Sequence, residues 1–138
     1  ASDTNKIFEQ NAEVFYNVEQ KYNINGIFLA SMAIHESGWG SSKIAKDKKN
    51  LFGFGAYDRS PYDSAVTFAT YEEGIETVAK YLVKNYINEK NAKIYNNETA
   101  TGTYYNGPTL VGISTRYCTD KDWPTKVYKY MNYLYERL

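Results

Sequence analysis

The pattern of apolar and polar positions predicts a chain built mainly of helices. Apolar side chains recur at helical spacing over residues 4–22, 73–88 and 123–137, so each stretch has one apolar face. Residues 26–36 are apolar nearly all round, which is typical of a helix buried in a core. Shorter helices or turns are expected within 41–56 and over 108–115. The expected fold class is mostly α.

Capping and turn residues mark where these helices begin and end. Asp3 or Thr4 can cap the first helix, and Asn25 can cap the buried helix. Residues 57–72 are predicted to form a loop, with a short extended piece around 65–68. The architecture expected is therefore one mostly helical domain with a small extended or loop region.

The length and net charge of the chain limit the classes of function that it can have. The chain has 138 residues, enough for one domain with a real core, and we assign residues 1–138 to a single domain. Its formal net charge is zero, which gives no basic field for nucleic acid and no polybasic membrane patch. No run of about 18 apolar residues exists, so membrane insertion is not expected. The start at Ala-Ser-Asp-Thr looks like a domain trimmed from a larger protein.

The cysteine and histidine content argues against a disulfide or a zinc site. Cys118 is the only cysteine, and His35 is the only histidine. His35-Glu36 does not begin a zinc-protease helix motif, because Trp39 stands where a second histidine is required. We expect no metal and no cofactor. Cys118 is interpreted as an inert thiol rather than a nucleophile.

Glu36 is the strongest candidate for chemistry. It stands where the apolar helix ends in a turn rich in glycine, serine and tryptophan. Burial and the negative end of the helix dipole both raise the pKa of a carboxyl group in that position. A carboxylic acid that stays protonated near neutral pH is what a glycosidase needs to protonate a leaving oxygen. The alternative is an ordinary solvated glutamate at a helix end.

Three sequence blocks resemble a known enzyme family. They are residues 36–42 (Glu-Ser-Gly-Trp-Gly-Ser-Ser), 50–53 (Asn-Leu-Phe-Gly) and 116–120 (Arg-Tyr-Cys-Thr-Asp). Together and in this order they resemble the bacterial and phage β-N-acetylglucosaminidases of glycoside hydrolase family 73, in the lysozyme superfamily. Residues 52–58 (Phe-Gly-Phe-Gly-Ala-Tyr-Asp) also resemble a subgroup of cell-wall glucosaminidases. The similarity runs from about residue 23 to the C-terminus and implies a lysozyme-like α-helical fold.

The resemblance implies a role for each matching residue. Glu36 corresponds to the general acid, and Tyr117 to a tyrosine that assists catalysis or binds substrate. Asp58 corresponds to a second acidic residue of the subgroup, although it can also cap its own turn. Other members carry their second carboxylate on a β-hairpin in a Thr-Glu-Tyr-like segment, which is not recognisable in this chain.

Five further residues are candidates for contact with a sugar. They are Trp39, Asn50, Phe52, Tyr57 and Tyr105. Aromatic rings are good surfaces for sugar stacking, but most aromatic residues of a small domain belong to its core and rim. Trp39 in particular can instead pack beneath the Glu36 turn.

The resemblance implies hydrolysis of the β-1,4 bond between N-acetylglucosamine and N-acetylmuramic acid in peptidoglycan. Inversion through a water activated by Asp58, retention through a carboxylate nucleophile, and retention through the substrate's 2-acetamido group remain open. The expected partner is the peptidoglycan glycan strand. The expected location is extracellular, at the cell wall, or on a phage particle, and the isolated domain is expected to be a monomer.

Other functions remain open. A muramidase or a lytic transglycosylase would act on the same polymer but leave different ends. A wall-binding or phage-tail structural module would keep the fold without catalysis. A cysteine peptidase using Cys118 and His35 is the least favoured, because nothing in the sequence marks a helix N-terminus that would activate the thiol.

Overall fold

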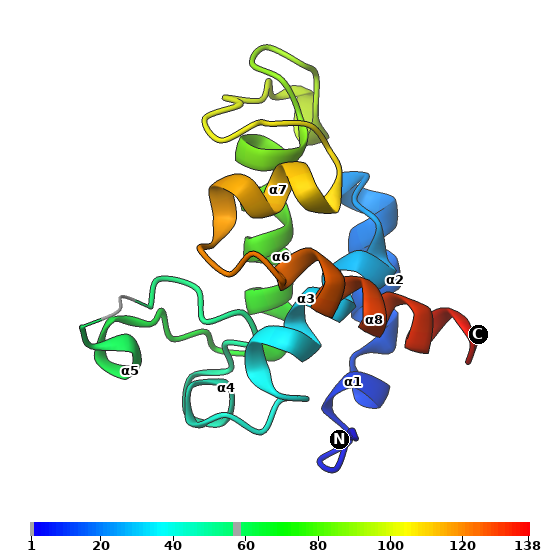
Figure 1. Ribbon diagram of the computed structural model, residues 1–138, viewed down its shortest axis with the longest axis vertical. Coiled ribbons are helices and arrows are strands. Elements are labelled where there is room, and N and C mark those ends of the chain that lie inside the picture. Colours follow the sequence, from blue (N-terminus) through cyan, green and yellow to red (C-terminus); the bar gives the residue numbers. More distant parts are fainter. Residues whose placement is uncertain (1, 57–58) are drawn as a thin grey trace.

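The computed structural model describes residues 2–56 and 59–138. Within these residues the chain is mainly helical, which confirms the expected fold class, and its one isolated β-bridge joins Lys93 and Thr99. The helices, shown in Figure 1, are α1 (Ile7–Gln10), α2 (Ala12–Tyr22), α3 (Gly26–Ser37), α4 (Lys43–Lys48), α5 (Pro61–Ser64), α6 (Tyr71–Leu82), η1 (Val83–Ile87), η2 (Tyr95–Asn97), α7 (Leu110–Tyr117) and α8 (Trp123–Tyr135). None of the helices in these two ranges is both long enough and apolar enough to cross a membrane.

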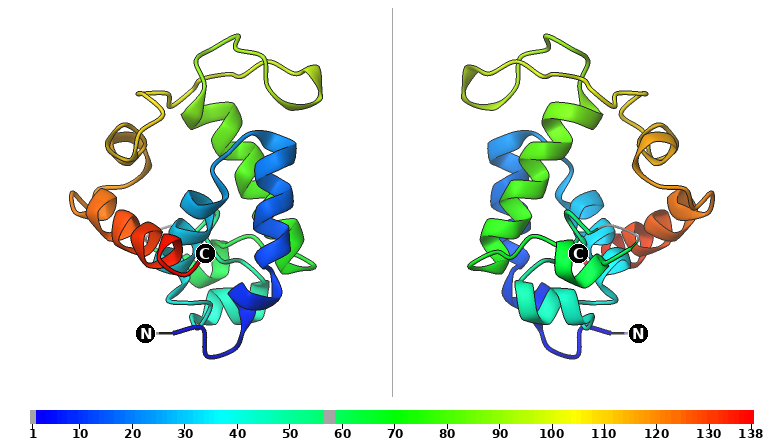
Figure 2. Two further views of the ribbon diagram at one scale, coloured as in Figure 1. Left: turned by 90° about the vertical axis from the view of Figure 1, so that its right-hand side faces the viewer. Right: turned by 90° about the vertical axis from the view of Figure 1, so that its left-hand side faces the viewer.

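The buried helix α3 lies at the centre of the fold. It packs against α8 on one side and α2 on another, while α2 also packs along α6 (Figure 2). Leu29, Met32 and Ile34 of α3 are completely buried. Because α3 is apolar nearly all round, it can be covered on several sides at once, as its sequence predicts.

Two side chains that were expected to cap helices accept hydrogen bonds from backbone amides at the start of α3 and α1. The side chain of Asn25 accepts a hydrogen bond from Phe28 N at 2.9 Å, which confirms it as the N-cap of α3. The Asp3 carboxylate accepts hydrogen bonds from the N–H groups of Phe8 and Glu9. Both caps satisfy amide groups that have no partner within their own helix.

The single helix predicted over residues 4–22 is wrong in one respect. The structure divides it into α1 and α2 at Asn11, whose φ of −106° and ψ of 11° leave the helical region. The Asn11 side-chain amide donates to Ile7 O at 2.8 Å. Asparagine favours such local bonds over the regular helix ladder, which explains the break.

The helix predicted over residues 73–88 also differs from its expectation. It begins earlier, at Tyr71, where the Thr70 side chain caps it, and it ends as a π-helix, η1. The segment after Arg59 contains the short helix α5 where only loop was expected. The piece around 65–68 forms no strand, but Val66 N donates to Phe54 O and Phe68 N donates to Lys48 O.

Candidate active site

A tight turn after α3 fixes the direction of Glu36. Gly38, Trp39 and Gly40 all adopt positive φ, at 57°, 59° and 76°. The buried Ser37 hydroxyl donates to Ala33 O at 2.6 Å and accepts from Gly40 N at 2.9 Å, so it ties the turn back onto the helix. Glycine adopts this left-handed conformation without steric cost, which explains the Gly-Trp-Gly pattern.

Glu36 lies in the last turn of α3 with most of its side chain buried. Only 24% of the side chain is exposed. Burial, and to a smaller extent the negative charge of Asp120, raises the pKa of the carboxyl group to about 7. A substantial fraction of Glu36 is therefore protonated at neutral pH, as a general acid requires.

His35 stands beside Glu36 without forming a permanent ion pair. The distance between His35 Nε2 and Glu36 Oε1 is 3.9 Å. Burial lowers the pKa of His35, the charge of Lys126 lowers it further, and Asp120 opposes both. The imidazole is therefore neutral near pH 7 and does not hold Glu36 in its ionised form.

Asp120 supplies an ionised carboxylate close to Glu36. It accepts hydrogen bonds from Lys126 Nζ at 2.8 Å and from Asp122 N at 2.9 Å, and these two bonds lower its pKa. Asp120 belongs to the third motif block, and the sequence alone assigns it no role. The signal was available, because it is an acidic residue three positions after the candidate Tyr117.

The structure brings Tyr117 to Glu36 from the end of α7. Burial raises the pKa of the Tyr117 hydroxyl, and the nearby Glu36 carboxylate is the next cause. The Tyr117 ring lies 5.7 Å from the Tyr86 ring and 5.6 Å from the Trp123 ring, measured between centroids. Tyr117 therefore stays protonated beside the acid and can donate a hydrogen bond there.

The neighbouring thiol has different partners. Cys118 is half-buried, and its Sγ contacts the backbone carbonyls of Ser114 and Asp120 at 3.9 and 3.7 Å. These contacts suit a structural thiol and give no support to a nucleophile paired with His35.

Trp39 lies in the core, where little of its ring is available to a sugar. It is 7% exposed, and its ring meets those of Phe8, Tyr130 and Tyr133 edge-on at 5.8, 6.0 and 5.5 Å. This position favours the packing interpretation of Trp39, in which the indole supports the Glu36 turn from below, over stacking on substrate.

The second motif block is also buried. Asn50 donates its side-chain amide to Phe54 O and Val66 O, and its carbonyl accepts from Phe52 N and Phe54 N. Asn50 and Phe52 are 1% and 2% exposed. The block therefore organises the loop after α4, and this favours positioning over the predicted direct contact with sugar.

The structure says less about the three remaining site candidates, Tyr57, Asp58 and Tyr105. Tyr57 and Asp58 lie outside the described residues, so their roles stay predictions. Tyr105 is half-buried in the loop before α7, where its N–H donates to Gly102 O at 3.2 Å. Within residues 2–56 and 59–138, no three side chains of histidine, cysteine, aspartate or glutamate gather to hold a metal ion.

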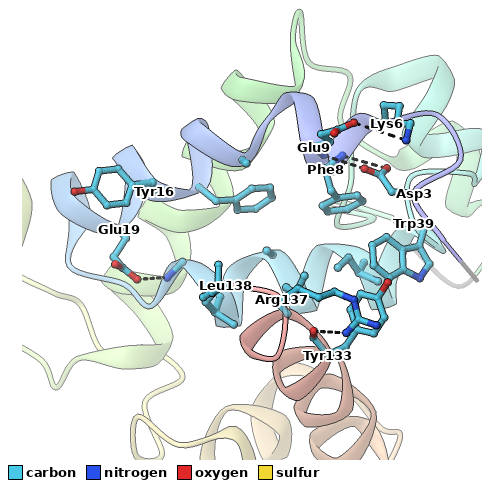
Figure 3. A pocket seen from close by; sticks show the side chains of 17 residues that line it. Asp3, Lys6, Phe8, Glu9, Tyr16, Glu19, Trp39, Tyr133, Arg137 and Leu138 are labelled. Carbon is cyan, nitrogen blue, oxygen red and sulfur yellow. Dashed lines mark hydrogen bonds and ion pairs between the residues drawn. The ribbon is translucent and has the colours of Figure 1, made fainter.

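A large apolar groove lies on another face of α3. It has a volume of about 740 Å³ and runs between α1, α2, α3 and the end of α8 (Figure 3). Trp39 and Tyr133 lie at one end of it, whereas neither Glu36 nor Tyr117 lines it. The candidate site is therefore separate from this groove.

Comparison with known proteins identifies relatives over most of the chain. The family model described as mannosyl-glycoprotein endo-beta-N-acetylglucosaminidase matches residues 12–136. A putative endo-beta-N-acetylglucosaminidase of Streptococcus pneumoniae is 35% identical over 97% of this chain and 18% of its own length. A beta-N-acetylglucosaminidase of Bacillus subtilis is 30% identical over 90% of this chain and 14% of its own length. The chain thus spans less than a fifth of these relatives.

Solved structures agree with this result. The catalytic domain of the autolysin Auto from Listeria monocytogenes has a TM-score of 0.67 at 18% identity, over 96% of this chain and 85% of that one. A catalytic mutant of Staphylococcus aureus autolysin E, in complex with the disaccharide NAG-NAM, has a TM-score of 0.59 at 26% identity, over 95% and 61%. The fold is therefore that of autolysin catalytic domains, and the resemblance inferred from the motif blocks is confirmed: the chain belongs to the glucosaminidase family.

Proposed function

We propose that this domain is an endo-β-N-acetylglucosaminidase that hydrolyses the β-1,4 bond between N-acetylglucosamine and N-acetylmuramic acid in peptidoglycan. The observation that carries the proposal is the Glu36 carboxyl, whose pKa of about 7 keeps it partly protonated beside Tyr117. Family membership and the names of the Streptococcus and Bacillus relatives support it. The NAG-NAM complex of autolysin E supports the choice of polymer.

In the proposed reaction Glu36 gives its proton to the bridging oxygen as the bond from that oxygen to the anomeric carbon of N-acetylglucosamine breaks. The N-acetylmuramic acid unit leaves with a free hydroxyl. Water then adds its oxygen to the anomeric carbon and returns one proton to the protein, so the new reducing end is N-acetylglucosamine. The transition state carries positive charge at that carbon, and negative charge nearby stabilises it.

Two described residues can contribute to this step. Asp120 is held ionised by Lys126, so it provides lasting negative charge near Glu36. The Tyr117 hydroxyl keeps its proton and can orient the 2-acetamido group of the substrate by donating a hydrogen bond to its carbonyl oxygen. Asp58 remains the proposed second acidic group, on the family resemblance alone.

The test is digestion of purified Gram-positive peptidoglycan, followed by borohydride reduction and mass spectrometry of the fragments. The proposal expects fragments that end in reduced N-acetylglucosamine. The Glu36→Gln variant should lose at least about two orders of magnitude of activity with its fold intact, as removal of a general acid predicts. Glu89→Gln, at an exposed position outside the site, serves as the matched control.

Other fragments would overturn parts of the proposal. Ends in reduced muramic acid would indicate a muramidase, and anhydro-muramic ends a lytic transglycosylase. Binding without any new ends would indicate a wall-binding or phage-tail structural module. Full activity in Glu36→Gln would remove Glu36 from its role.

The proposed substrate also indicates where the protein acts. We place it outside the bacterial cell at the wall, or on a phage particle that attacks the wall. The names of the autolysin relatives support the first location. The isolated domain is proposed to be monomeric, which sedimentation equilibrium over a range of concentrations would test.

A further inference from the structure

A series of aromatic rings leads away from Tyr117 to the surface of the domain. The Tyr86 ring lies 5.7 Å from the Tyr117 ring, and the Tyr104 ring stacks on Tyr86 at 5.0 Å with an angle of 27° between their planes. Tyr81 lies 6.0 Å from Tyr86 and 5.2 Å from Phe54. We call Phe54, Tyr81, Tyr86 and Tyr104 the aromatic strip. It joins the loop after α4 to the loop before α7 across α6 and η1.

The π-helix η1 holds the Tyr104 end of the strip in place. A π-helix leaves carbonyl groups out of the regular i→i+4 ladder, and such segments recur at functional sites. The Lys84 carbonyl accepts from the N–H groups of Thr101 and Gly102, both at 3.0 Å. The Asn85 carbonyl accepts from Tyr104 N at 2.7 Å. Irregular backbone at the end of α6 therefore fixes the backbone of Tyr104 itself.

Gly102 makes this attachment possible. Its φ is +58°, and a Cβ at this position would lie 2.5 Å from Lys90 N. A side chain at residue 102 would push the loop away from the turn after η1, so the close approach requires glycine. Figure 1 shows this loop, in yellow, above η1 and beside α7.

The Tyr104 ring is covered by Tyr86 on one face, and the residue is still partly exposed to solvent. Its side lying on Tyr86 is packed, yet the residue is 38% exposed, whereas Tyr86 is 6% exposed. A ring held rigidly in this way loses little conformational entropy when a ligand packs on it. The apolar face of a pyranose ring is a suitable partner, and the phenol hydroxyl can bond to a sugar hydroxyl or amide.

We infer that Tyr104 is a glycan-binding residue, on which an N-acetyl sugar of the peptidoglycan strand stacks at a position removed from the cleaved bond. The two ring contacts from Tyr104 to Tyr117 place it near Glu36 but not at the reacting atoms. The occupant follows from the proposed function, on which this inference rests. A polymeric substrate extends beyond the bond that breaks, so it needs contacts of this kind.

The first test measures binding without cleavage, in the Glu36→Gln background. The probe is the β-1,4-linked tetramer of N-acetylglucosamine, measured by isothermal titration calorimetry. Adding Tyr104→Ala should weaken binding about tenfold, as truncation of an aromatic anchor does. Adding Tyr104→Phe should restore binding to within about twofold, because the ring is kept. Tyr128→Ala, which removes an exposed tyrosine of α8, should leave binding unchanged.

A second measurement covers the case in which Tyr104→Ala does not fold. In the Glu36→Gln protein with isotope-labelled tyrosine, the Tyr104 ring signals are assigned by their absence in Tyr104→Phe. Addition of the tetramer should shift these signals, while the Tyr128 signals stay in place. The inference is overturned if the Tyr104 signals do not move, or if a folded Tyr104→Ala variant binds the tetramer within about twofold of its parent.

The outcomes separate this inference from the proposed function. If the unmodified domain releases N-acetylglucosamine ends and Tyr104→Ala binds as its parent does, the inference fails and the function stands. If the domain releases no such ends but the tetramer shifts Tyr104, the inference stands and the function fails. In active protein, Tyr104→Ala should raise KM on the polymer and change kcat little, which a loss of fold would not produce.

Discussion

Replacing Glu36 with glutamine should stabilise the domain, and increasingly so as the pH rises. The folded protein raises the pKa of Glu36 from its ordinary value of 4.5 to about 7, chiefly by burial. Between these two pH values the folded state therefore holds a proton that the unfolded state has released. Stability of the unmodified domain falls as the pH rises through this window and levels off above it. Glutamine does not titrate, so the variant escapes this loss.

The difference between 4.5 and about 7 corresponds to roughly 3 kcal/mol in the free energy of unfolding. Near pH 4.5 the two proteins should differ only by the constant effect of the substitution. Above pH 7.5 the variant should gain that full amount, which raises the melting temperature by roughly 10 °C for a domain of this size.

Thermal unfolding followed by circular dichroism, from pH 4 to pH 8.5 in matched buffers, measures this difference. Glu89→Gln removes one carboxyl at an exposed position and controls for the change in net charge. A stability difference that stays flat across the range would show that Glu36 is not held in its protonated form. A stability difference that moves in favour of the parent as the pH rises from 4.5 to 8 would refute the reasoning outright.

Three further predictions follow from hydrogen bonds, charge and backbone shape. Burial is the main cause of the raised pKa of Glu36 and the charge of Asp120 adds to it, so Asp120→Asn should move the alkaline limb of the kcat profile to lower pH; an unchanged profile would show that the two groups do not interact. Asn50→Asp should cost about 3 kcal/mol in urea unfolding, because a carboxylate oxygen would face two backbone carbonyls, and a cost below about 1 kcal/mol would contradict the buried network. Gly102→Ala should weaken binding of the N-acetylglucosamine tetramer about tenfold, because the alanine side chain meets the neighbouring backbone and displaces the loop. Gly107→Ala also introduces a side chain at positive φ, +92°, but meets nothing within 4 Å, so it should cost about 1–3 kcal/mol of stability and leave binding unchanged; equal losses of binding in both variants would refute the argument from close approach.

Features encoded over a few neighbouring residues could be predicted from the sequence. The buried helix α3, its Asn25 cap and the turn at Gly38 depend on local pattern and capping chemistry, and the structure contains all three. The position of Glu36 at the end of α3 follows from the same local pattern. The upward shift of its pKa follows from that position as well. These parts needed no knowledge of which helices meet in space.

Features that depend on distant contacts could not be predicted. The carbonyl groups of the π-helix η1 accept hydrogen bonds from the loop at residues 101–104. The pattern of residues 83–87 alone does not predict such contacts. Aromatic residues look alike in sequence, so Trp39 and Phe52 were candidates for sugar contact until packing placed them in the core, while Tyr104 was overlooked. Asp120 gains its importance only because α7 ends beside Glu36.

The burial of α3 has a consequence for the lifetime of the site. Amide hydrogens exchange with solvent through local opening where packing is weak, and only through global unfolding where packing is complete. Leu29, Met32, Ala33 and Ile34 are 0% exposed, so the segment before Glu36 has no local route to open. Its amides should exchange at the rate set by unfolding of the whole domain, whereas the loop bearing Tyr104 should exchange sooner. The acid is therefore anchored in the slowest-exchanging part of the molecule, while the loop that carries Tyr104 depends on a few backbone hydrogen bonds to η1.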